Sequence, residues 1–116
     1  MIVGIGVDVV EIARFASTIQ TTPALRARLF TPSERGLPMH SLAGRFAAKE
    51  ALAKAFGAPG WLRWHDAVVV VGPAGAPSWE LTGTLAARAL ELGVLATHLS
   101  ISHDGGLATA MVVAEK

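Results

Sequence analysis

The segment from Ser41 to Phe56 constrains the fold most, because it is the clearest helix in the sequence. It is dense in alanine, the residue with the highest helix propensity, and it is followed by Gly57, a residue common just past helix ends. Valine- and isoleucine-rich runs on both sides of it predict strands. The expected strands are Ile2–Ile12, Ala67–Val71, a short one near Trp79–Leu81, and a hairpin of Thr97–Ser102 and Ala108–Ala114 around Asp104-Gly105-Gly106.

Two further regions predict shorter helices. Residues 13–38 are broken by Thr22-Pro23, Thr31-Pro32 and Pro38, which indicates short helical pieces. Gly83–Leu92 carries apolar residues on one face and is stopped by Gly93. Because strands and helices are mixed without a strict βαβ rhythm, we expect an α+β fold. The length of 116 residues suits a single domain, residues 1–116.

Composition narrows the class of protein. Apolar residues make up 52% of the chain and charged residues 16%, which is typical of an ordered globular protein with apolar surface left for self-association. The absence of cysteine excludes disulfides, thiolate nucleophiles and thiolate metal sites. The start of the chain lacks the features of a signal peptide, and no apolar run approaches the ~20 residues of a spanning helix. We therefore expect a soluble cytoplasmic protein without a membrane partner.

Charge is distributed unevenly. Between Ala13 and Arg45, five arginines stand against one acid, Glu34, so that this segment carries +4 and the rest of the chain −3 of the total of +1. Two interpretations are open: a solvated arginine face, or a docking surface for an acidic partner. Nucleic acid is not expected as a partner, because no basic stripe alternates with aromatic residues and tyrosine is absent.

Asp8 is the first candidate site residue. In a strand its side chain shares a face with Gly4 and Gly6, and a carboxylate inside an apolar run needs a cation or hydrogen-bond donors. Glycine in a strand often marks close approach by a ligand or by another backbone, so the three residues suggest an open shelf beside a carboxylate. The alternative is an exposed aspartate at the end of a strand.

Glu50 and Lys54 are the next candidates, one turn apart on the long helix. A helical wheel places Glu50 at the edge of the apolar stripe, with Lys54 just beyond it and with Ala43 and Ala47 leaving room beside them. A half-shielded carboxylate there could hold a metal ion, but an ordinary surface pair between Glu50 and Lys54 explains the same spacing. Lys49 projects into the apolar stripe, where its stem could simply lie along the surface.

A third constellation is the run from Ser100 to Gly106, which contains Ser102 and His103. Its hydroxyl, imidazole and turn amides could cradle a phosphate, although a hairpin turn with solvated polar residues explains the run equally well. The two carboxylates Asp8 and Glu50, in a chain without thiolates, suit a hard ion such as Mg²⁺.

Three motifs occur in a fixed order along the chain, with a fourth, weaker one at Trp64-His65-Asp66-Ala67-Val68-Val69. They are Gly4-Ile5-Gly6-Val7-Asp8-Val9-Val10-Glu11-Ile12-Ala13-Arg14-Phe15, Gly44-Arg45-Phe46-Ala47-Ala48-Lys49-Glu50-Ala51-Leu52-Ala53-Lys54-Ala55-Phe56-Gly57, and Leu99-Ser100-Ile101-Ser102-His103. Together they resemble the holo-acyl-carrier-protein synthase family of phosphopantetheinyl transferases. Order, spacing and total length fit this family over essentially the whole chain.

The resemblance implies a 4'-phosphopantetheinyl transferase-like fold, in which a small antiparallel sheet packs with one long central helix and shorter helices. It also implies a homotrimer with sites at subunit interfaces. The site residues follow from the same resemblance. Asp8 and Glu50 would coordinate Mg²⁺ with the coenzyme A pyrophosphate, Lys54 would lie against the phosphates, the nucleotide end would be held by Arg45, Lys49, Ser102 and His103, and the acidic face of the carrier protein would be met by Arg14, Arg26 and Arg28.

The implied reaction transfers the 4'-phosphopantetheine arm of coenzyme A to a serine of an apo acyl carrier protein and releases 3',5'-ADP. Asp8, Glu50 and Lys54 would be the catalytic residues, with Glu50 taking the serine proton either directly or through a metal-bound water. One departure from the family is Gly75-Ala76-Pro77, where members commonly have Gly-Lys-Pro. Two other hypotheses fit the residues alone: a Mg²⁺-dependent nucleotide phosphohydrolase, and a non-catalytic oligomeric module that binds a small anion.

Overall fold

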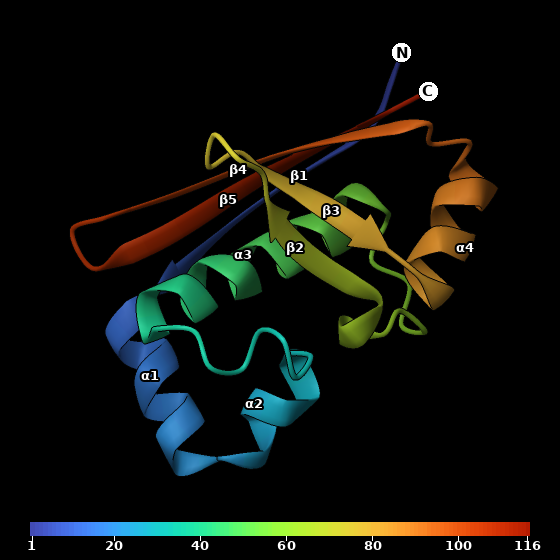
Figure 1. Cartoon of the computed structure of the whole chain (residues 1–116). Coiled ribbons are helices and arrows are strands. Elements are labelled where there is room, and N and C mark those ends of the chain that lie inside the picture. Colours follow the sequence, from blue (N-terminus) through green and yellow to red (C-terminus); the bar gives the residue numbers. More distant parts are fainter.

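A three-stranded antiparallel sheet and one long helix form the centre of the structure, a computed structural model of residues 1–116 (Figure 1). The strand order is β1-β5-β4, so that the first strand, β1 (Ile2–Glu11), lies beside the last, β5 (Leu107–Glu115), with β4 (Ala96–Asp104) at the other edge. Helix α3 (Met39–Ala55) packs across one face of this sheet. The α+β prediction is therefore confirmed.

The remaining elements surround this centre. Helices α1 (Ile12–Thr21) and α2 (Ala24–Leu29) lie together below α3 in the view of Figure 1. A short 3-10 helix, η1 (Trp64–Asp66), leads into a separate two-stranded sheet of β2 (Ala67–Val71) and β3 (Pro77–Leu81), and α4 (Gly83–Leu92) follows. No helix is long and apolar enough to cross a membrane.

Element boundaries differ slightly from the sequence prediction. The first strand ends at Glu11 because α1 begins directly at Ile12, and α3 begins at Met39, earlier than expected, directly after Pro38. Proline is well tolerated at the start of a helix because it has no N–H to lose there. The predicted hairpin is confirmed and extends on both sides, with Gly105 and Gly106 at φ +56° and +79° in its turn. Two successive positive φ angles are what a tight two-residue hairpin turn requires.

Gly4 and Gly6 face helix α3. A Cβ at Gly4 would lie 1.9 Å from the carbonyl oxygen of Ala55, and one at Gly6 would lie 1.7 Å from that of Ala51. The glycines thus permit close approach by another backbone, one of the two possibilities left open above. The predicted open shelf beside Asp8 is wrong, because α3 fills that space.

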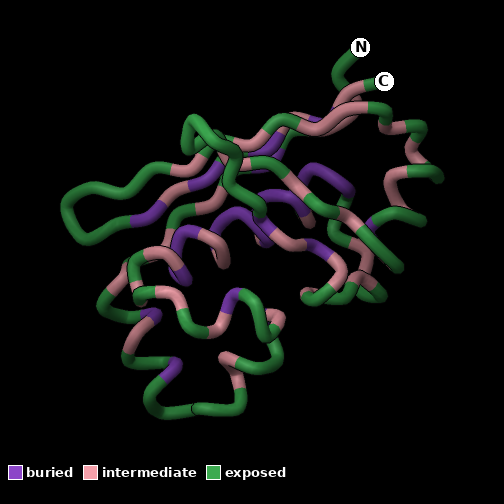
Figure 2. Tube along the Cα trace, viewed as in Figure 1, coloured by how far each residue is buried: buried purple, intermediate pink, exposed green.

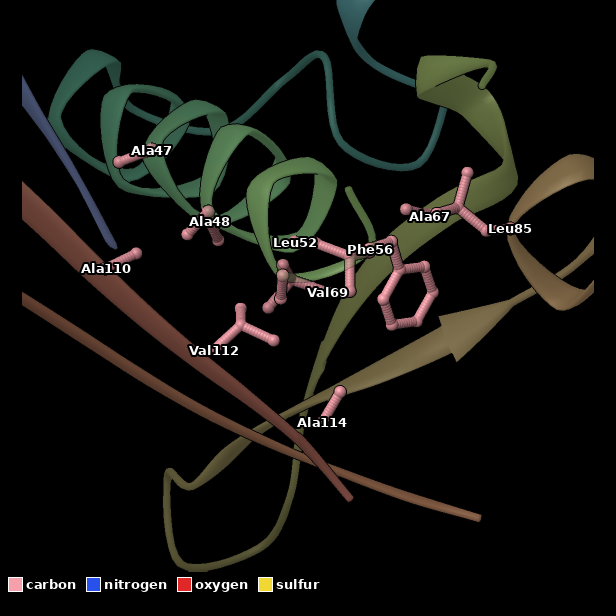
Figure 3. Close-up of a cluster of buried hydrophobic side chains, with 12 residues drawn as sticks. Ala47, Ala48, Leu52, Phe56, Ala67, Val69, Leu85, Ala110, Val112 and Ala114 are labelled. Atoms are coloured by element: carbon pink, nitrogen blue, oxygen red, sulfur yellow. The ribbon is translucent and has the colours of Figure 1, made fainter. Parts of the chain in front are cut away.

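The alanines of α3 serve the same close packing. Ala43, Ala47 and Ala51 are fully buried, so the prediction that Ala43 and Ala47 leave room for a ligand is also wrong. Figure 3 shows the main core, in which Ala47, Ala48 and Leu52 meet side chains of the two sheets and α4. A second core cluster joins α1 and α2 to the start of α3; its members are Phe15, Ile19, Leu29, Phe30, Leu42, Ala43 and Ala108.

The start of α4 is held by a residue that is distant in sequence. Asp66 accepts hydrogen bonds from the Thr84 N–H at 2.8 Å and from the Thr84 hydroxyl at 2.7 Å. Burial alone would raise the pKa of Asp66, but these hydrogen bonds, with the nearby positive charges of Arg63 and His65, outweigh it and lower the pKa. Asp66 therefore supplies the capping acceptor that Thr82, the residue before the helix, does not.

The opposite face of the three-stranded sheet is apolar and uncovered. Ile5, Val7 and Val9 of β1 are 56%, 51% and 59% exposed, and Met111 of β5, the register partner of Val7, is 48% exposed. Figure 2 shows that α3 is largely buried, whereas long stretches of the sheet strands are exposed. An uncovered apolar sheet face of this kind marks an interaction surface.

Candidate active site

Asp8 and Lys54 meet between β1 and α3. The ammonium group of Lys54 donates to Asp8 Oδ1 at 3.1 Å and to the carbonyl oxygen of Val7 at 3.0 Å. Asp8 is 20% exposed and Lys54 52% exposed, so the pair stands at the rim of a hollow rather than in the core. Lys54 therefore supplies the cation that a carboxylate in an apolar strand needs.

Glu50 lies one turn before Lys54 and takes part in no ion pair. The alternative of an ordinary surface pair between Glu50 and Lys54 is thus wrong, because Lys54 turns to Asp8 instead. Burial raises the pKa of Glu50, and the negative charge of Asp8 raises it further against the opposing charge of Lys54. A half-buried carboxylate with a raised pKa accepts a proton more readily than an exposed one, which suits a general base.

A groove of about 660 Å³ opens beside these three residues, and we call it the Asp8 groove. Asp8, Glu50 and Lys54 line one part of it. The other lining residues are mostly apolar, among them Leu25, Leu29, Phe46 and Trp64. The groove is also lined by two arginines, Arg14 from α1 and Arg28 from α2, and by the polar residues Glu11 and Thr18. A neighbouring cavity of about 700 Å³ shares Arg28, Glu50 and Trp64 with this groove.

The three arginines proposed to face a partner differ in their exposure and in their position relative to the groove. Arg14 and Arg28 are exposed and line the Asp8 groove, whereas Arg26 is half-buried on α2 and does not line it. Glu34, the one acid of the basic segment, is 2% exposed and cannot offset their charge at the surface. The exposed charge of residues 13–45 is therefore entirely positive.

None of the four residues predicted to hold the nucleotide end lines the Asp8 groove of the same chain. Ser102 and His103 are exposed near the end of β4, where the His103 ring lies 5.2 Å from that of His40. Arg45 is half-buried on α3, and its Nε is buried without a hydrogen-bond partner. These residues form no single pocket with Asp8 and Glu50 within one chain.

Lys49, which the resemblance placed among the residues that hold the nucleotide end, lies in the interior of the chain. It is 2% exposed, and its ammonium group donates to Leu29 O at 2.7 Å, to Glu34 Oε1 at 2.9 Å and to Trp64 O at 3.2 Å. These three contacts use the three hydrogen atoms of the ammonium group, so none remains for a nucleotide. The alternative that the Lys49 stem simply lies along the surface does not hold either, because the whole side chain is buried. Burial lowers the pKa of Lys49, and the hydrogen bond and charge of Glu34 oppose that effect.

Sequence reasoning also missed Glu34 and Trp64. Glu34 is the buried partner of Lys49, and Trp64 lines both hollows and packs 5.9 Å from the ring of Phe46. A signal existed for each residue. Glu34 is the single acid in an otherwise basic segment, and Trp64 opens the weaker fourth motif.

Comparison with known proteins decides the family. A sequence model described as the 4'-phosphopantetheinyl transferase superfamily matches residues 4–112. The chain belongs to this superfamily. It is 59% identical to the holo-[acyl-carrier-protein] synthase of Beutenbergia cavernae, over 100% of both chains.

Solved structures of the superfamily agree with the fold. The holo-[acyl-carrier-protein] synthase of Neisseria meningitidis has a TM-score of 0.91 and 34% identity over 100% of both chains. The Helicobacter pylori holo-[acyl-carrier-protein] synthase, solved in complex with coenzyme A, has a TM-score of 0.84 and 32% identity over 96% of this chain and 99% of its own. The predicted resemblance to phosphopantetheinyl transferases is therefore confirmed, and the chain is an enzyme of that class.

The carboxylates of this transferase fit a divalent cation that is shared with a substrate. Asp8 and Glu50 are close enough for the charge of one to raise the pKa of the other, and a cation between them would relieve that repulsion. The structure gathers no group of three or more His, Cys, Asp or Glu that could hold a metal ion by themselves. Mg²⁺ is commonly bound by only one or two carboxylates together with substrate phosphates, and two carboxylates match that mode.

Proposed function

We propose that this transferase moves the 4'-phosphopantetheine arm of coenzyme A onto a serine of an apo acyl carrier protein, releasing 3',5'-ADP, in the Asp8 groove. The observation that carries the assignment to this groove is the meeting of Lys54 with Asp8, 46 residues apart, beside a Glu50 whose pKa is raised. An anion-handling lysine and two carboxylates at the rim of one groove suit the transfer of a phosphate-linked group.

In the proposed reaction the serine oxygen attacks the β-phosphorus of coenzyme A, and the bond from that phosphorus to the bridging oxygen breaks. Glu50 accepts the serine proton, which its raised pKa favours. Lys54 stabilises the negative charge that grows on the departing phosphate. Asp8 holds Lys54 in place and, with Glu50, would hold Mg²⁺, which when bound supplies charge neutralisation of the pyrophosphate.

The basic residues at the groove suit an acidic carrier protein. Arg14 and Arg28 are exposed along it, and Arg26 lies on the same helix as Arg28. Positive charge placed beside the reacting groups speeds and orients the encounter with an acidic partner. We therefore propose that α1 and α2 form the carrier-protein face.

We further propose that the protein is a homotrimer with its sites at subunit interfaces, and that it is cytoplasmic. The uncovered apolar face of Ile5, Val7, Val9 and Met111 supports self-association. The separation of Arg45, Ser102 and His103 from the Asp8 groove supports shared sites, because a neighbouring copy could present them there.

The proposal is tested by incubating the protein with an apo carrier protein, coenzyme A and Mg²⁺, and weighing the carrier by mass spectrometry. The wild type should add one phosphopantetheine to each carrier, and Glu50→Ala should add none although it folds, as judged by circular dichroism. Near-normal turnover by folded Glu50→Ala would remove Glu50 from the mechanism. Release of phosphate from coenzyme A without any carrier would instead favour the phosphohydrolase hypothesis.

A further inference from the structure

Lys49 is a buried cation that the proposed mechanism does not use. Its ammonium group joins three separate segments: the end of α2 through Leu29 O, the turn after α2 through Glu34 Oε1, and the start of η1 through Trp64 O. The same group lies 5.1 Å from the centre of the Phe30 ring. A charge held this far from water is retained only where its partners are fixed around it.

The segments that Lys49 joins form one wall of the Asp8 groove. Arg28, Leu29 and Trp64 line the groove, while Asp8 and Lys54 line it from β1 and α3. Arg28 and Trp64 also line the neighbouring cavity, so this wall separates the two hollows. The position of the wall therefore decides the width of the groove.

Apolar packing of Leu29 and Trp64 also holds this wall, and Arg35 donates to Phe30 O at 2.9 Å and to Ala27 O at 3.2 Å, but regular structure contributes little to it. Helix α2 has six residues, η1 has three, and residues 30–38 between α2 and α3 form no helix or strand. The other polar contact between α2 and η1 is a hydrogen bond of His65 Nε2 to Ala27 O at 2.7 Å, which is exposed. A hydrogen bond that is exposed to water is electrostatically weaker than one in the protein interior, so the buried bonds of Lys49 hold the wall more firmly than the His65 bond does.

Glu34 connects Lys49 to the turn that follows α2. Its Oε1 accepts from Lys49, from the Thr31 N–H at 3.0 Å and from the Thr31 hydroxyl at 3.2 Å, while Oε2 has no partner. One carboxylate oxygen thus fixes both the cation and the turn that follows α2. Removing Glu34 would therefore take away two hydrogen bonds of this turn together with the carboxylate partner of Lys49.

We propose that the Lys49–Glu34 pair is a positioning device, which holds the wall of Arg28, Leu29 and Trp64 at the distance from Asp8 that the coenzyme A arm requires. Lys49 touches no reacting atom in this proposal and acts through the wall. The inference rests on the proposed transfer function, because the groove is the site of that function. It replaces the nucleotide contact that the family resemblance implied for Lys49.

The test is the double variant Lys49→Met with Glu34→Leu, which removes both charges and leaves no buried ion unpaired. In the carrier-protein assay its KM for coenzyme A should rise about tenfold while kcat falls less than about threefold, because ground-state binding is lost and the reacting groups remain. A matched control is Arg88→Met with Glu91→Leu. Arg88 likewise donates to a backbone oxygen, Phe56 O, and to a carboxylate, but on α4, away from the groove.

The control pair should lower the melting temperature without changing the KM for coenzyme A. An unchanged KM in the Lys49–Glu34 double variant, with folding shown by circular dichroism, would overturn the proposal and leave the pair a purely structural one. If the double variant does not fold, Glu34→Gln takes its place. It removes the negative charge but keeps a side-chain oxygen that can accept from Lys49 and Thr31, so a smaller rise in KM is expected, and an unchanged KM again counts against the proposal. A wild type that transfers no phosphopantetheine would refute the function instead, so the two failures are distinct.

Discussion

Gly6→Ala tests whether the contact between β1 and α3 controls both stability and the site. The new methyl carbon would lie 1.7 Å from the carbonyl oxygen of Ala51, whereas contacts of a Cβ below 3.0 Å essentially do not occur. Reaching 3.0 Å from 1.7 Å requires α3 to move away from β1 by about 1.3 Å. The opposing atom belongs to a helix backbone and not to a flexible side chain, so the strain cannot be relieved locally.

The size of the effect follows from this displacement. Overpacking a core costs about 1–3 kcal/mol, and a clash with backbone belongs at the upper end, about 3 kcal/mol. For a domain of this size that loss corresponds to a fall in melting temperature of roughly 10–15 °C. The displaced helix also carries Glu50 and Lys54 away from Asp8, and a misplacement of about 1 Å costs on the order of 100-fold in rate.

The variant is measured by thermal unfolding at one fixed protein concentration and by mass spectrometry of the carrier-protein product. Gly36→Ala is the matched control, because a Cβ at Gly36 meets nothing within 4 Å and its φ is ordinary. It should melt within about 2–4 °C of the wild type, in line with the small effect of most surface substitutions. A folded Gly6→Ala with the stability and rate of this control would refute the reasoning.

Three further predictions concern other parts of the molecule. Asp66→Ala, which removes both acceptor contacts to Thr84, should destabilise the protein by about 1–2 kcal/mol. Because the pKa of Asp66 is lowered in the folded state, this loss should be present at neutral pH in a urea titration and shrink as the pH falls through that pKa. Val7→Glu, beside Met111 on the apolar face, should yield folded particles of lower mass in size-exclusion chromatography with light scattering; an unchanged mass would contradict the proposed trimer interface. Glu50→Gln should melt at a higher temperature than the wild type at neutral pH, because the raised pKa of Glu50 means that its charged form is disfavoured by folding, and the gain should disappear at pH values below the unfolded pKa. A gain that grows on acidification would show the sign to be wrong.

Local sequence patterns predicted the helices and strands well. Proline and glycine marked most helix ends, and alternation of apolar residues marked the strands, because both depend on near neighbours in the chain. Asp8, Glu50 and Lys54 were proposed together only through the family resemblance, and the contact of Lys54 with Asp8 places two of them side by side.

What the sequence did not reveal depends on distant packing. The spacing of Gly4 and Gly6 shows that something approaches closely, but only the position of α3 shows that it is Ala51 and Ala55 of the same chain. The burial of Lys49 against Glu34 could not be predicted either, because Glu34 lies 15 residues away in a segment without regular structure. No periodicity connects such a pair, so a buried lysine and one that binds a ligand look alike in sequence.

The pairing of the first strand with the last has a consequence for how the molecule forms. Asp8 lies on β1, whose only partner strand is β5, and the register joins Asp8 to Ala110. During synthesis at about 5–20 residues per second, the edge of β1 therefore waits unpaired until nearly all the intervening chain exists. Contacts of such long sequence separation slow folding. The carboxylate of Asp8 thus lies on a strand that is made long before the partner strand with which it pairs.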